Sequence, residues 1–190
     1  MDKGRLEAFS DGVIAILITI MVLDLRTPAG PDWAALRPMA PMFLSYVLSF
    51  VFIGIYWNNH HHMIQTCSRV NGKVLWANLH LLFWLSLVPF VTHWMGESHF
   101  APLPAAMYGI VLILAAAAYT ILQNCLVVLH GNDSKLAAAV GSDQKGKLSL
   151  ALYAIAIPLA FSRPRFAGAI YVIVALIWLV PDRRIERKLN

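Results

Sequence analysis

Six apolar stretches recur along the chain, some of them barely long enough to span a membrane, and they most constrain what it can fold into. A helix needs about 20 largely apolar residues to cross the hydrocarbon core of a bilayer. The composition agrees, because 59% of the residues are hydrophobic and 13% are charged, whereas soluble domains carry about 25% charged residues. We therefore predict an all-α, polytopic integral membrane protein with one six-helix transmembrane domain over residues 1–190. The expected spans cover residues 6–25, 38–58, 74–95, 104–129, 148–161 and 166–180.

Basic residues gather in alternate connections between the expected spans. With the N-terminus inside, the inner segments hold eleven of the fifteen Lys and Arg residues. An excess of Lys and Arg marks the cytoplasmic side of a membrane protein, so we expect both termini in the cytoplasm. The net charge of +5 is accordingly interpreted as a topological signal, and no nucleic-acid partner is predicted. Cys67 and Cys125 are expected to be free thiols, because neither belongs to a CxxC pair.

Charged side chains are scarce within the expected spans. Apart from Asp11, the residues just before it and the terminal Asp24, no span contains Asp, Glu, Lys or Arg. Proton-coupled carriers generally use ionisable residues at membrane depth, so this scarcity counts against active transport. The sequence also lacks a glycine-rich phosphate loop, HExxH and GxSxG, and we predict that the protein is not an enzyme. A small-solute or proton-coupled carrier and a non-conducting membrane scaffold remain as alternatives to a channel.

The first expected helix combines a polar first half with an apolar second half. At 100° per residue, one narrow stripe of this helix lies within about 60° of Ile16, whereas Ser10 and Asp11 lie about 120° and 220° away. A helix with two such faces needs two different neighbours, which we expect to be the rest of the subunit and a pore. The candidate pore-lining residues are those of the stripe: Gly12, Ile16, Thr19, Ile20 and Leu23.

Polar residues at the inner ends of the first two spans are expected to meet. Asp11 would accept a hydrogen bond from Trp57 Nε1 or from one of His60, His61 and His62, and the sequence does not decide which histidine does so. The alternative is that the helix end lies in headgroup water with the histidines in a solvated loop. A three-histidine metal site is disfavoured, because consecutive residues on a helix point in three directions.

The same residues carry a resemblance to a known family. Arg5, Phe9, Ser10 and Asp11 match the RxxxFSD signature at the start of the first helix in the transmembrane protein 175 family of potassium channels. The similarity continues through FSDGVIAILIT and VLDL, through SFVFIGIYWNNHH in the second span, and through NLHLLFWLSLVPFVTHW in the third. It therefore covers three of the six spans, and the other three agree in hydropathy alone.

The resemblance implies a potassium-selective, leak-type cation channel that acts as a homotetramer around a central pore. In the family, bulky aliphatic residues of the first helix form a hydrophobic constriction, and the matching positions here are Ile16, Ile20 and Leu23. Thr19 matches a pore-adjacent hydroxyl that supports selectivity for potassium. Ala15 stands where some members carry serine, so selectivity is expected to be weaker. Like the family, this sequence lacks the TVGYG filter.

The resemblance also implies a structural network and a cellular setting. The signature residues would tie the first helix to the second and third, with partners among Trp57, His60, His61 and Asn78. The expected partners of the whole protein are permeating K⁺ ions, the lipid membrane and three further copies of the chain. No cofactor and no resident metal ion are expected, and the location would be the plasma membrane of a prokaryote.

Overall fold

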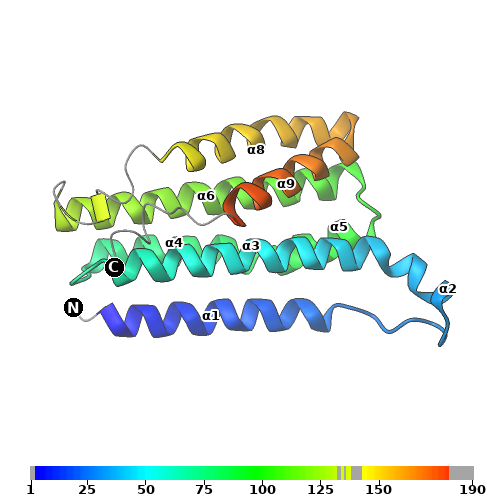
Figure 1. Ribbon diagram of the computed structural model, residues 1–190, viewed down its shortest axis with the longest axis horizontal. Helices are drawn as coiled ribbons and strands as arrows, with labels where there is room; N and C mark the ends of the chain where they lie inside the picture. The colour runs from blue at the N-terminus through cyan, green and yellow to red at the C-terminus, as the bar shows by residue number, and fades with distance from the viewer. Residues whose placement is uncertain (1–2, 132–133, 135, 138–142, 180–190) are drawn as a thin grey trace.

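The chain is a bundle of helices in the computed structural model, which describes residues 3–131, 134, 136–137 and 143–179 (Figure 1). No strand occurs among these residues, so the predicted all-α class is confirmed. The element order is α1 (Lys3–Leu23), α2 (Trp33–Leu36), η1 (Arg37–Met39), α3 (Ala40–Gln65), α4 (Gly72–Ser86), α5 (Val88–Glu97), α6 (Pro102–His130), α8 (Gln144–Ser162) and α9 (Pro164–Leu179).

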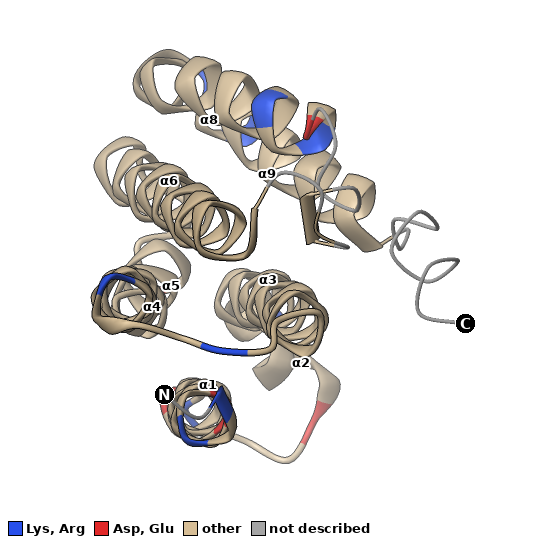
Figure 2. Cartoon of the chain, turned by 90° about the vertical axis from the view of Figure 1, so that its left-hand side faces the viewer, with Lys and Arg blue, Asp and Glu red and all other residues tan. Residues whose placement is uncertain are grey.

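Helix α1 lies at one edge of the bundle. It packs against α3, α4 and α5, while α6 joins α4 and α5 to the α8–α9 pair on the other side. The end-on view shows α1 below the other helices, with neighbours on one side of it (Figure 2). One face of α1 is therefore covered by its own chain and the other is not.

Four helical segments of the described chain are long and apolar enough to cross a membrane. They are α1, the joined α2–α3 segment Trp33–Gln65, the joined α4–α5 segment Gly72–Glu97, and α6. Helix α9 is apolar but shorter, and α8 begins with the polar turn at residues 144–147. The six expected spans thus correspond to α1, α3, α4 with α5, α6, α8 and α9, although Val180 lies outside the described residues.

The predicted end of the second span at residue 58 is wrong, because α3 continues to Gln65. Hydropathy falls after Trp57, yet His60, Met63 and Ile64 are buried at helical spacing. The packing of this face keeps the segment helical where hydropathy alone indicates a loop. The three histidines consequently lie on a helix, which excludes the solvated-loop alternative.

The third span is broken at Leu87 and not continuous through Pro89. Helix α4 ends at Ser86, Leu87 N donates to Trp84 O at 3.2 Å, and Pro89 sits in the first turn of α5. Proline lacks an amide hydrogen and is best tolerated in that first turn. The redirected α5 brings Thr92 Oγ1 to 2.6 Å from Ser49 Oγ on α3, in the bundle interior.

Helices α3 and α5 approach each other closely at Gly96. A Cβ atom added there would lie 2.7 Å from the Cα atom of Met42. Backbone cannot move aside as a flexible side chain does, so this contact requires glycine. Gly54 on α3 offers a matched comparison, since an added Cβ there meets nothing within 4 Å.

We predict that Gly96→Ala destabilises the fold by about 1–3 kcal/mol, the usual range for overpacking. Gly54→Ala should leave the melting temperature unchanged or raise it, because Ala favours a helix over Gly by about 1 kcal/mol. Thermal unfolding of the two variants in detergent checks the expectation. Equal melting temperatures would show that the α3–α5 approach is not the limiting contact.

Candidate functional site

The two faces of α1 have different surroundings. Its buried residues recur at helical spacing and face α3, α4 and α5: Leu6, Ser10, Ile14, Leu17 and Met21. The opposite face carries the candidate pore-lining stripe of Gly12, Ile16, Thr19, Ile20 and Leu23. All five stripe residues are exposed in the single chain, including Ile16 at 57% and Leu23 at 81%. The described part of the chain therefore leaves the stripe uncovered.

Two members of the stripe are not bulky aliphatics. Gly12 leaves open space on the helix surface, because an added Cβ there meets nothing within 4 Å. Thr19 Oγ1 donates its hydrogen to Ile16 O at 2.9 Å, with Ala15 O at 3.2 Å. Since the hydroxyl hydrogen is directed into the helix backbone, the oxygen lone pairs are left to face outward. Thr19 thus offers an acceptor oxygen on an otherwise apolar stripe.

A buried chain of hydrogen bonds joins α1 to α4 and α3. Ser10 Oγ donates to Leu6 O at 2.8 Å and accepts from Asn78 Nδ2 at 2.9 Å. Asn78 Oδ1 lies 2.8 Å from His60 Nε2, and because an amide oxygen only accepts, this histidine nitrogen donates. The side chains of Ser10, Asn78 and His60 are 0%, 2% and 1% exposed. Each has a partner on another helix, whereas the second ring nitrogen of His60, Nδ1, is buried without a hydrogen-bond partner in the described chain.

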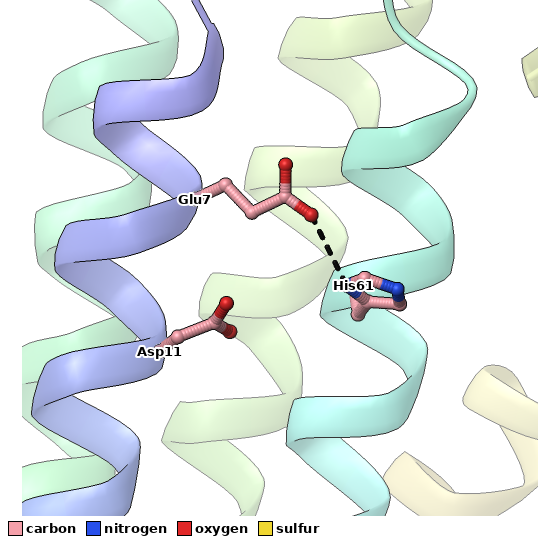
Figure 3. Close-up of side chains that lie close together, drawn as sticks. All are labelled: Glu7, Asp11 and His61. Carbon is pink, nitrogen blue, oxygen red and sulfur yellow. Dashed lines mark ion pairs between the residues drawn. The ribbon is translucent and has the colours of Figure 1, made fainter.

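A second polar cluster, formed by Glu7, Asp11, Trp57 and His61, lies beside the hydrogen bonds of Ser10, Asn78 and His60. It is partly exposed. Trp57 Nε1 donates to Asp11 Oδ1 at 3.0 Å, so the structure selects the tryptophan as the donor to this carboxylate. His61 Nδ1 lies 3.1 Å from Glu7 Oε1, as Figure 3 shows. Sequence reasoning did not single out Glu7. The available signal was its position one helical turn before Asp11, which places both carboxylates on the same face.

The three histidines have three different partners. His60 bonds Asn78, and His61 lies beside Glu7 and Asp11. His62 packs edge-on against His61, with ring centroids 5.8 Å apart. Of the three, His61 is the one whose ring nitrogen approaches the two carboxylates of α1.

The expected partner of Arg5 is not found in the described chain, and Phe9 of the same signature is not packed, which corrects the predicted network. Both side chains are exposed, Phe9 at 55%, and within the described chain Arg5 makes no hydrogen bond or ion pair with Trp57, His60, His61 or Asn78. The reason is geometric: on a helix they fall within about 20° of Ile16, on the exposed stripe side. The signature is contiguous in sequence but divided between two faces.

We predict that Asn78→Ala destabilises the protein by about 0.6–2 kcal/mol, because His60 Nε2 and Ser10 Oγ both lose their interhelical partner. Asn59→Ala is the matched control, since its amide bonds Ile55 O within the same helix at 2.8 Å. The measurement is the unfolding midpoint in detergent. If the Asn59 variant is destabilised as much as the Asn78 variant, the hydrogen bonds between helices contribute no more to stability than a bond within one helix.

Comparisons with known proteins point to one family. A family model described as endosomal/lysosomal potassium channel TMEM175 matches residues 5–89, which include the stripe and both polar clusters. A protein of Chryseobacterium sp. (strain P1-3) named as a potassium channel is 57% identical over 190 residues, covering 100% of this chain and 99% of that protein. The human endosomal/lysosomal proton channel TMEM175 is 27% identical over 180 residues, 85% of this chain and 36% of the human protein.

A solved structure shows the same architecture. The crystal structure of a lysosomal potassium-selective channel TMEM175 homolog from Chamaesiphon minutus superposes with a TM-score of 0.81 at 26% identity, covering 94% of this chain and 96% of that one. Sequence similarity over the full length and agreement of fold point to the same assignment. The chain belongs to the family of the endosomal/lysosomal potassium channel TMEM175.

Proposed function

We propose that four copies of this chain form a potassium-conducting channel in which the α1 stripe lines the pore. The observation that carries the proposal is the exposure of Ile16, Ile20 and Leu23 on a helix whose other face is packed. Contact with lipid alone would not require a glycine at position 12 or an outward-facing oxygen on Thr19. A water-containing axis shared by several chains accommodates both.

The relatives support the same conclusion. The protein that matches this chain end to end at 57% identity is named as a potassium channel, and the superposed crystal structure is titled potassium-selective. In keeping with the family, we place the protein in the plasma membrane of a prokaryote with both termini cytoplasmic. Conduction would be of the leak type, since no described helix carries the regular arginines of a voltage sensor.

The proposed constriction works by excluding water. A ring of four Ile16 side chains presents an apolar neck, and narrow apolar necks block ions by dewetting. An ion that enters such a neck loses hydration, which is costly unless other oxygen atoms compensate. A small outward movement of α1 widens the ring and admits a partly hydrated cation. Ile20 and Leu23 extend the apolar lining along the same axis.

Thr19 supplies the compensating oxygen next to this neck. Its hydroxyl hydrogen is directed into α1, so the four oxygens would face the ion with their lone pairs. K⁺ holds its water less tightly than Na⁺, and partial dehydration beside a few hydroxyl oxygens therefore favours K⁺. With no TVGYG filter in the sequence, discrimination rests on the cost of dehydration and would be modest.

Shortening the side chain of Ile16 tests the constriction. We expect Ile16→Ala to raise K⁺ flux into liposomes by roughly tenfold, equivalent to a barrier lower by about 1.4 kcal/mol. Ile155→Ala is the matched control, because Ile155 is also 57% exposed but belongs to α8. Helix α8 lies on the far side of the bundle from α1 (Figure 1). Both variants should have the mass of four chains in detergent.

Three results would contradict the proposal: unchanged flux in the Ile16 variant, an equal rise in the Ile155 variant, or a monomeric mass. A carrier would show saturable uptake coupled to a second solute, and a scaffold would show no flux. Proton flux measured in the same liposomes would reveal the activity for which the human relative is named.

Removing the hydroxyl of Thr19 tests its part in selectivity. We expect Thr19→Val, which keeps the shape of the side chain, to lower the ratio of K⁺ to Na⁺ flux at least several-fold. Thr120→Val on α6 is the control, because Thr120 Oγ1 makes the same type of backbone contact, to Ala116 O at 3.0 Å. Ion-replacement measurements of reversal potential give the ratio directly. A ratio that falls equally in both variants would place the effect outside the pore.

A further inference from the structure

Two carboxylates and an imidazole converge at the N-terminal end of α1. Glu7 and Asp11 lie one turn apart on α1, and His61 faces them from α3 (Figure 3). One ligand atom from each residue lies within 4.8 Å of the other two. The side chains of Glu7 and His61 are 23% and 30% exposed. The cluster is thus compact enough to share one ion and open enough for an ion to enter.

The charges of this cluster are not balanced by basic side chains. Within the described chain, no Lys or Arg forms an ion pair with either carboxylate. Lys3 Nζ donates to the backbone oxygens of Ile64 and Gln65 at the end of α3. Arg5 lies on the exposed stripe side of α1. Carboxylates one turn apart on a helix repel each other. A cation held between them would remove this repulsion.

The surroundings hold the three side chains in place. Trp57 donates to Asp11 Oδ1 and stacks on the His61 ring, with centroids 5.9 Å apart and planes 21° apart. The amide nitrogen of Gln65 lies 2.7 Å from His61 Nε2. An amide nitrogen only donates, so His61 Nε2 accepts and the ring hydrogen is on Nδ1, the atom that lies 3.1 Å from Glu7 Oε1. Ligating histidines are commonly oriented by such an outer partner.

The geometry points to a divalent transition-metal site, of the kind that binds Zn²⁺, formed by Glu7, Asp11 and His61. Imidazole nitrogen and carboxylate oxygen are ordinary ligands of this ion, and a fourth position is left for water. Mg²⁺ and Ca²⁺ prefer oxygen alone and should bind more weakly. On binding, the ring hydrogen of His61 moves from Nδ1 to Nε2, and a half-turn of the Gln65 amide presents its oxygen to receive it.

Such an ion would fasten α1 to α3. Two of its ligands belong to the helix that carries the stripe, and the third belongs to the helix against which α1 packs. Metal binding is a property of the folded chain and does not depend on whether it conducts potassium. The two proposals can therefore fail separately.

Calorimetric titration of the full chain with ZnCl₂ in detergent, without a polyhistidine tag, tests the site. We expect one site per chain. His61→Ala and Glu7→Gln should each weaken binding by more than about tenfold, because even changes to outer partners cost about 10–100-fold in affinity. Asp11→Asn should weaken it too while keeping an oxygen for Trp57. Gel filtration verifies that each variant is folded.

Two histidine variants serve as controls. His93→Ala removes a similar His–Glu pair on α5, 3.2 Å from Glu97 Oε2, and His62→Ala removes the neighbour of His61. Both should bind Zn²⁺ as the unaltered chain does. Binding that survives in the His61 variant, that is lost in the His62 variant, that MgCl₂ displaces at equal concentration, or that is absent from the unaltered chain would overturn the proposal.

Discussion

Buried polar groups in this bundle must find partners without help from water, and that requirement fixes how α1 sits against its neighbours. An unpaired amide or hydroxyl away from water costs several kcal/mol by transfer measurements. Ser10, Asn78 and His60 come from three helices and are joined by two buried hydrogen bonds. Sliding α1 by one residue would rotate Ser10 away and leave Asn78 Nδ2 without its acceptor, while the Asn78–His60 bond between α4 and α3 would remain. This chain of bonds therefore sets the register of α1.

The helices themselves were predictable because apolar length is a strong signal in the sequence. Their ends were less so. The polar residues after Trp57 indicated a loop, whereas the burial of His60, Met63 and Ile64 keeps α3 helical to Gln65. The third span was expected as one helix over residues 74–95, whereas the structure breaks it at Leu87, two residues before Pro89. Both differences come from packing between helices, which hydropathy along one segment does not contain.

The candidate site shows the same division. Helical periodicity separated the stripe of Ile16 from Ser10 and Asp11, and the structure has these residues on exposed and packed faces. Grouping by motif was less successful, because RxxxFSD joins residues that are close in sequence but point in different directions. Arg5 was assigned partners it does not contact, and Glu7 was overlooked although its helical face is that of Asp11. The helix face on which a residue lies predicted its contacts better than its closeness in sequence to the other motif residues.

The hydrogen bonds that hold α1 are concentrated at one of its ends. Near Ser10 and Asp11 it is bonded to α3 and α4, whereas Ile14, Leu17 and Met21 contribute apolar contacts alone. Apolar contacts are non-directional and resist rotation weakly. Beyond the other end of α1, the exposed ion pair of Arg26 with Glu97 of α5 is the side-chain polar contact nearest to Leu23 along the described chain. Rotation of α1 about its bonded end would therefore displace its far end most. A tilt of about 5° about Ser10 displaces Ile16 by about 0.8 Å and Leu23, about 20 Å along the axis, by about 1.7 Å.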